Sequence, residues 1–140
     1  MKKTLKVMAI LLFVVSMTAL TSCNKEAEQL IVGKWECVSA SYSDDGVTFP
    51  TPDLKGMIWQ FYADGSMVVT TPEGYTHEFD LIGLSPSYII LGNLLTISYT
   101  DYDGDLESDV YVIQELTKNK LLLKENDDDD WLSVEFKKIL

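Results

Sequence analysis

From residue 30 to residue 140 the chain alternates apolar and polar positions in short runs, and no run keeps the period of a helix. The runs are rich in Val, Ile, Tyr, Phe, Trp and Thr, and turn residues separate them. They predict strands over residues 33–43, 56–63, 66–71, 75–82, 87–91, 94–100, 107–116, 120–125 and 131–138. The sequence therefore predicts an all-β domain.

The separators between these runs have the chemistry of tight turns. Asp64-Gly65, Gly92-Asn93 and Asp103-Gly104 contain residues that accept the positive φ angles of two-residue hairpins. Consecutive strands are therefore expected to be antiparallel neighbours in a meander. The longer connection Ser43–Leu54 holds two prolines and an Asp-Asp-Gly run, and we expect it to be a lid or an omega loop.

Three runs place their apolar residues on one face of the expected strand, because alternate residues of a strand point to the same side. These residues are Met57, Trp59 and Phe61, then Leu95, Ile97 and Tyr99, then Leu132, Val134 and Phe136. One shared core is compatible with a sandwich or with a closed barrel, and closure removes exposed strand edges. We therefore predict an antiparallel meander that closes into an up-and-down barrel of about 8–9 strands.

The N-terminus has the layout of a secretory signal. Three lysines and no acid precede the apolar run Val7–Val15, and small residues precede Cys23. The apolar run is shorter than the roughly 20 residues of a membrane span. Leu20-Thr21-Ser22-Cys23 resembles the lipobox of bacterial lipoproteins, which implies cleavage before Cys23 and modification of that residue by acyl chains such as palmitate.

These features divide the chain into a signal peptide over 1–22, a lipidated Cys23 with a polar tether over 23–29, and a packed domain over 30–140. Its length fits one domain, which we expect to be a monomer. Without residues 1–22, eight basic residues, all Lys, and 22 acidic residues give a net charge of −14. Such a surface repels phosphate backbones and anionic headgroups. Nucleic acid is therefore excluded as a partner, and the membrane is reached through the lipid anchor.

The residues after Cys23 bear on location. Asn24 differs from the Asp that commonly retains lipoproteins at the inner membrane, and residues 25–28 resemble a charged export signal. We expect an envelope protein anchored to the outer membrane, facing the periplasm or the cell surface.

Gly33-Lys34-Trp35 opens the first expected strand as Gly-x-Trp opens the first strand of lipocalins. Together with the hairpins over 61–66 and 88–99, this pattern resembles the lipocalin-like domains of Gram-negative lipoproteins, over residues 30–140. The resemblance implies an antiparallel calyx for a small apolar ligand, with Trp35 packed across its closed end, and it implies no catalysis. The chain has no Arg that could stack on this Trp.

An aromatic set could line such a cavity or stack against a glycan, and the alternative is that it fills a β core. The set comprises Trp35, Trp59, Phe61, Tyr88, Tyr99, Tyr111 and Phe136. The predicted ligand-binding residues among them are Trp35, Trp59, Phe61, Tyr99 and Phe136. Either way, the sequence holds no Gly-x-Ser-x-Gly, Cys-His or His-Glu-x-x-His arrangement. We therefore expect neither an enzyme nor a cofactor, and Cys37 is expected to be a buried structural thiol.

Residues 101–109 carry five carboxylates, and hard oxygen ligands at alternating positions suit Ca²⁺. Asp101, Asp103 and Asp105 are the predicted metal ligands, although the spacing is not that of an EF-hand and a solvated hairpin tip is the alternative. Counting hairpins places Asp64 and the acidic runs 101–109 and 127–130 at one end of the barrel.

Two functions follow. The first is a lipid-anchored module that binds a small apolar molecule or a glycan. The second is an interaction, inhibitor or assembly protein with a packed core, whose acidic end docks a basic partner. A cavity of several hundred Å³ would favour the first function, and a solid core the second.

Overall fold

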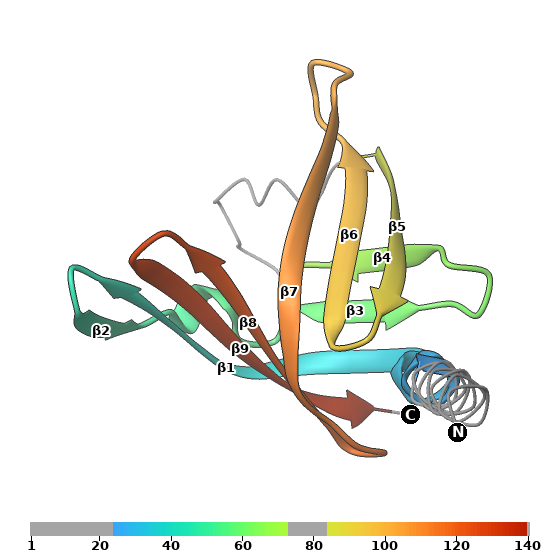
Figure 1. The fold of residues 1–140 in the computed structure, drawn as a ribbon, viewed down its shortest axis with the longest axis horizontal. Helices are drawn as coiled ribbons and strands as arrows, with labels where there is room; N and C mark the ends of the chain where they lie inside the picture. The colour runs from blue at the N-terminus through green and yellow to red at the C-terminus, as the bar shows by residue number, and fades with distance from the viewer. Residues whose placement is uncertain (1–23, 73–83, 140) are drawn as a thin grey trace, which may run out of the picture.

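The computed structural model describes residues 24–72 and 84–139 of the chain. The described residues form nine strands in one antiparallel sheet, and Figure 1 shows this sheet wrapped around a common interior, as the alternation predicted. They are β1 (Gly33–Asp44), β2 (Val47–Pro50), β3 (Ile58–Phe61), β4 (Met67–Thr70), β5 (Leu84–Leu91), β6 (Leu94–Thr100), β7 (Leu106–Leu116), β8 (Lys120–Asp127) and β9 (Asp130–Ile139). The predicted signal 1–22, the lipidation site Cys23 and the strand predicted over 75–82 lie outside the described residues.

The strands form a nearly closed barrel. Their order is β4-β3-β1-β9-β8-β7-β6-β5, and β9 closes the meander by pairing with β1 from Lys34↔Ile139 to Ser43↔Trp131. The remaining seam lies between β4 and β5, where the described residues make one isolated bridge, Ser66↔Ser87. Tyr88 reinforces that bridge, since its backbone N–H donates to the Gly65 carbonyl at 2.8 Å. The predicted up-and-down barrel is confirmed.

The connection Ser43–Leu54 is not the lid or omega loop that its length and prolines indicated. Val47–Pro50 folds back on the end of β1 as β2, and Tyr42 stacks on Phe49 with ring centres 5.2 Å apart. A short 3₁₀ helix, η1 (Pro52–Leu54), follows, and its Leu54 is 1% exposed. The segment is held in place because β2 pairs with β1 and because Leu54 packs into the core of the barrel.

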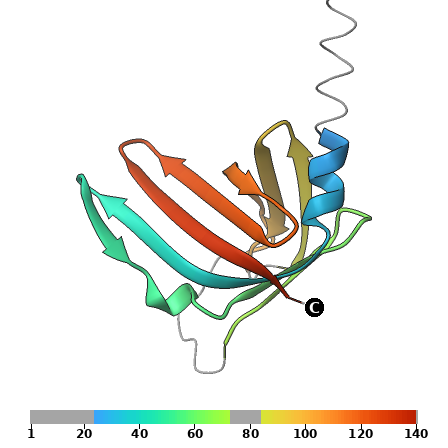
Figure 2. The same cartoon turned by 90° about the horizontal axis from the view of Figure 1, so that it is seen from below.

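Residues 24–31, expected as a tether without regular structure over 23–29, form an α-helix instead. Figure 2 shows this helix beside the end of the barrel where β5 turns into β6. Ile31 is fully buried in the core and Ala27 packs against it, so tertiary contacts stabilise a helix that is too short to be stable alone. Within the described residues, no helix is both long and apolar enough to cross a membrane.

The three predicted core faces meet inside the barrel. Members of all three faces, from Met57 to Phe136, belong to one buried cluster, and Leu132 packs against its edge. The ring centres of Trp59 and Phe136 are 4.9 Å apart, although β3 and β9 are not neighbours in the sheet. The convergence of side chains from successive hairpins, which the sequence predicted, is therefore confirmed.

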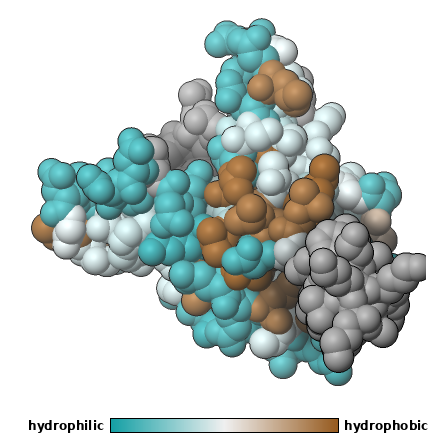
Figure 3. Space-filling model, viewed as in Figure 1, coloured by the Kyte–Doolittle hydropathy of each residue, from teal (hydrophilic) through white to brown (hydrophobic). Residues whose placement is uncertain are grey.

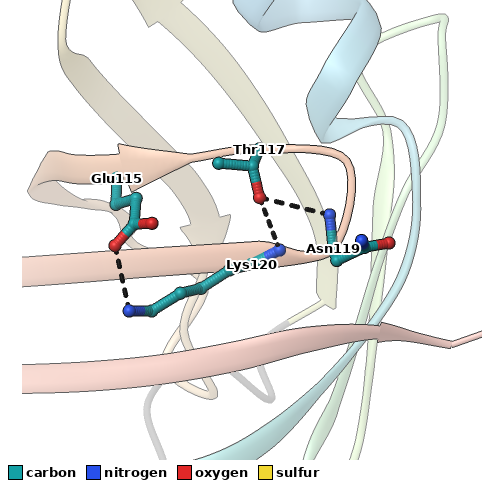
Figure 4. A network of polar contacts seen from close by, with 4 residues as sticks. All are labelled: Glu115, Thr117, Asn119 and Lys120. Atoms are coloured by element: carbon teal, nitrogen blue, oxygen red, sulfur yellow. Dashed lines mark hydrogen bonds and ion pairs between the residues drawn. The ribbon is translucent and has the colours of Figure 1, made fainter.

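Local hydrogen bonds stabilise the turn between β7 and β8 (Figure 4). Thr117 Oγ1 accepts hydrogen bonds from the backbone N–H groups of Asn119 and Lys120, at 3.3 and 3.1 Å. Lys120 Nζ also forms an ion pair with Glu115 Oε2 at 2.9 Å. These local contacts fix the register at this end, while pairing between β7 and β8 stops at Val112↔Lys124. Beyond that pair the two strands diverge toward the other end of the barrel.

Candidate binding site

Trp35 seals one end of the barrel, which we call the closed end. It is fully buried, and its Nε1 donates a hydrogen bond of 2.7 Å to the Ile31 carbonyl at the end of the helix. The Lys138 ammonium lies 4.9 Å from the centre of a Trp35 ring and donates to the Leu30 carbonyl at 2.8 Å. Burial lowers the pKa of Lys138. Lys138 thus occupies the position over the Trp35 ring that an Arg would take, and the sequence lacks Arg. In the sequence, the pair Lys137-Lys138 near the end of the last strand was the only indication of this contact.

Gly33 is required by this arrangement. Its φ is +131°, which side chains rarely adopt, and a Cβ here would lie 3.0 Å from Lys138 Cε. The lysine stem therefore passes over the glycine to reach the ring of Trp35. This contact explains physically why Gly and Trp occur two residues apart at the start of β1.

Trp59 lies at the centre of the aromatic core. Its ring centre is 6.2 Å from Phe61, 5.8 Å from Tyr111 and 4.9 Å from Phe136. Trp59 is 1% exposed, yet among the described residues its Nε1 has no hydrogen-bond partner. A buried N–H without an acceptor costs about 1–3 kcal/mol. The interior therefore holds a donor that a ligand or a water molecule with an acceptor oxygen would satisfy.

The structure brings all five predicted aromatic residues into one core. Trp35 and Trp59 are directly paired across β1 and β3, and Phe61 and Phe136 contact Trp59. Tyr99 is 5% exposed on β6. Their packing is that of a β core, and their role in binding a ligand stays a prediction.

The opposite, open end of the interior has a different character. Tyr99 and Tyr111 are buried on β6 and β7, and Asp109 and Glu125 are half-buried close to them. Burial raises the pKa of Tyr111 well above its usual value, and the charges of Glu125 and Asp109 raise it further. The acidic run 101–109 includes Asp109, but the sequence did not predict that Asp109 and Glu125 lie near Tyr111, because strand alternation alone does not show which strands are neighbours. The open end thus combines aromatic rings with negative charge, which disfavours an anionic ligand.

Described residues line a pocket at each end of the barrel, and neither of these two pockets is lined by Trp59 or Phe136. One pocket, of about 420 Å³, lies between the N-terminal helix and β5. It is lined by Glu28, Gln29, Val32, Ala63, Asp64, Gly65, Tyr88, Ile89 and Ile90. The other, of about 370 Å³, lies at the open end, lined by Tyr42, Ser43, Asp44, Glu125, Asp130, Trp131 and Leu132. The second pocket borders the interior, because Tyr42, Glu125 and Leu132 share a face with the core residues of their strands.

The predicted metal ligands lie at the tip of the β6–β7 hairpin. Asp101 Oδ1 accepts hydrogen bonds from the backbone N–H groups of Asp103 and Asp105, at 2.9 and 2.8 Å. The carboxylate therefore holds the turn itself. Across the described part of the chain, no group of three or more His, Cys, Asp or Glu residues is arranged to hold a metal ion.

The prediction of one shared acidic end is wrong for Asp64. Phe61 pairs with Gly33, so the turn that holds Asp64 lies at the closed end. The β8–β9 tip lies at the open end, where Ser43 pairs with Trp131. The additional strand β2 does not cause this difference, because β3 pairs antiparallel with β1 as expected. The count instead placed one strand, over 75–82, between β4 and β5 and so made these two strands parallel, whereas the bridge Ser66↔Ser87 beside them is antiparallel. Figure 1 also shows the β6–β7 and β8–β9 tips pointing in different directions.

Comparison with known proteins identifies the class. The family model described as a lipocalin-like domain matches residues 31–123, and the chain belongs to this family. No curated protein matches the chain.

Two solved structures have the same fold. A lipocalin-like protein from Bacteroides uniformis is 17% identical, with a TM-score of 0.52, and the match covers 79% of this chain and 99% of that one. An uncharacterized protein from Bacteroides eggerthii is 18% identical, with a TM-score of 0.50, and the match covers 78% of this chain and 99% of that one.

Proposed function

We propose that this chain is a lipid-anchored, non-enzymatic protein of the bacterial envelope whose barrel binds a small apolar molecule with an acceptor oxygen. The observation that carries the binding proposal is Trp59 Nε1 in the middle of the core, a buried donor with no acceptor in the part of the chain that the structure describes. Membership of the lipocalin-like family supports it, since closed β-barrels of this size hold either side chains or one small ligand.

The open end indicates which apolar molecules fit. Asp109 and Glu125 lie near Tyr99 and Tyr111, so a carboxylate that enters there would meet like charge at low dielectric. An uncharged ligand avoids that penalty and can still accept a hydrogen bond from Trp59. We therefore propose a neutral molecule, an ester, ketone or alcohol, in preference to a fatty-acid anion.

Native mass spectrometry of the full chain, extracted in mild detergent without refolding, tests whether a ligand is retained. The charge preference is tested with cis-parinaric acid and its methyl ester, which differ in the carboxylate alone. The ester should bind more tightly and should lose affinity in Trp59→Phe. Equal or tighter binding of the acid would contradict the proposal.

The interaction module with a packed core is the second function, and the dense ring contacts around Trp59 favour it. This second function would be supported if native mass spectrometry detects no retained ligand and if neither parinaric probe binds. A basic partner protein would then be sought at the two acidic hairpin tips of the open end, by cross-linking in cells with Asp103 and Asp129 replaced in turn.

A further inference from the structure

The outer face of β5, β6 and β7 carries large aliphatic side chains in water. Ile89, Leu91, Leu94 and Val110 are 62%, 69%, 41% and 48% exposed. Leu91 pairs with Leu94, and Ile89 and Val110 both pair with Thr96, so their side chains lie on one face of the sheet. We call these four residues the aliphatic face. Figure 3 shows apolar residues gathered on this side of the molecule.

A contiguous apolar surface of this kind marks a contact with a partner or a membrane. Leu91 and Leu94 of the aliphatic face flank the β5–β6 turn, where Gly92 has a φ of +62° and lets the chain reverse. Its residues are not needed for the core, because alternate residues such as Ile90, Leu95 and Ile97 already face the interior. Packing of the core therefore does not explain why these four exposed positions carry apolar side chains.

The position at which the helix begins indicates what covers the aliphatic face. The helix begins at Asn24, and Asn24 Oδ1 accepts a hydrogen bond of 3.0 Å from the Gly92 backbone N–H. Cys23 is the preceding residue, and consecutive Cα atoms are about 3.8 Å apart. Acyl chains on Cys23 would therefore leave the protein beside the turn that Leu91 and Leu94 flank. Figure 2 shows the helix and this turn side by side.

We propose that the aliphatic face is a membrane-docking surface that rests against the bilayer holding the acyl chains of Cys23. This inference rests on the lipid anchoring proposed above. A helix fixed to the barrel, in place of a loose tether, would hold this face against the lipid. The occupant is the bilayer because the anchor enters it at the edge of the aliphatic face.

The distribution of charge agrees with this orientation. The acidic tip at Asp101–Asp105 lies at the other end of β6, roughly 20 Å away for a strand of this length. The β8–β9 tip is likewise at the open end, away from the β5–β6 turn. The contact is thus apolar, and the strongly acidic hairpins remain in water.

The test uses the full chain, produced with its own signal so that Cys23 is acylated, in vesicles of phosphatidylethanolamine and phosphatidylglycerol. A spin label is placed at Leu91→Cys or Ile89→Cys, and at Leu106→Cys as the matched control. Leu106 is a leucine that is 77% exposed at the far end of β6 and β7. Cys37 is buried and does not compete for the label. Collisions with oxygen report lipid, and collisions with a water-soluble nickel chelate report solvent.

Docking predicts that labels at positions 89 and 91 collide several-fold more with oxygen relative to nickel than the label at position 106. Chains that float with the vesicles but show equal ratios at all three positions overturn docking and leave the anchor intact. Chains that do not float overturn both proposals. Spin–spin broadening between labels at position 91 would show a second copy on this face, and it would overturn docking as well.

Discussion

The ammonium group of Lys138 lies over the ring of Trp35, 4.9 Å from its centre, and ties the last strand to the first at the closed end of the barrel. The same group donates a hydrogen bond to the Leu30 carbonyl, at the C-terminal end of the helix. One side chain thus joins the helix, β1 and β9.

Replacing Lys138 with Met should destabilise the domain by about 1–3 kcal/mol, because the cation–ring contact and a charged hydrogen bond are lost while the apolar stem is kept. Lys138→Arg should retain most of the stability, since a guanidinium can make both contacts. Urea denaturation of the three proteins measures this. If Lys138→Met and Lys138→Arg were equally stable, the contact would have no energetic role.

The two fully buried tryptophans of the core should respond differently to the same substitution. Trp35→Phe and Trp59→Phe remove the same volume, but of the hydrogen bonds within residues 24–72 and 84–139 only the one from Trp35 to the Ile31 carbonyl is lost. Trp35→Phe should therefore cost about 2 kcal/mol more than Trp59→Phe in ligand-free protein. Chemical denaturation gives both values. A larger cost for Trp59→Phe would show that its N–H already has an acceptor.

Cys37 makes stability depend on pH in the alkaline range. Burial raises the pKa of the Cys37 thiol from 9.0 to about 11, so the folded protein holds this proton where the unfolded chain has lost it. The stabilisation is complete below pH 9 and is lost as pH rises toward 11, by about 2–3 kcal/mol in total.

Cys37→Ala isolates this effect. Tyr88 and Tyr111, whose pKa values are also raised by burial, contribute equally to both proteins. The difference in unfolding free energy between the wild type and Cys37→Ala, under reducing conditions, should therefore narrow between pH 8 and pH 11. A constant difference would mean that the thiol ionises as readily in the folded state as in the unfolded state.

Asp101 should matter to the β6–β7 hairpin without any metal. Asp101→Ala removes the acceptor of two backbone hydrogen bonds and should cost about 1 kcal/mol. Asp103→Ala, at an exposed position of the same turn, should change stability by less than about 0.5 kcal/mol. Thermal unfolding with chelator and with millimolar Ca²⁺ completes the test. Stabilisation by Ca²⁺ that disappears in both variants would instead support the metal site predicted from the sequence.

The local pattern of the sequence was enough to predict strands, turns and core faces. Alternation at Met57, Trp59 and Phe61 identifies a buried face without any knowledge of its partners, because alternate side chains of any strand share a side. Gly92-Asn93 likewise predicts its turn from the backbone freedom of glycine.

The candidate site was predictable only in part, because its parts come from strands far apart in the chain. The five aromatic residues could be named, but the missing partner of Trp59 Nε1 depends on what surrounds that atom in the folded core. The carboxylates of Asp109 and Glu125 near Tyr111 depend on how β6, β7 and β8 are paired.

The sequence by itself determined the all-β class, the meander and the residues that face inward, since each follows from neighbouring positions along the chain. Only the tertiary structure decided that residues 24–31 are a helix, that β2 adds a strand, that Asp64 lies at the closed end away from the β8–β9 tip, and that Lys138 covers Trp35. These features are fixed by contacts between distant segments, above all the burial of Ile31 and the pairing of β1 with β9. A short helix or a four-residue strand has too little local stability to be formed, or predicted, without them.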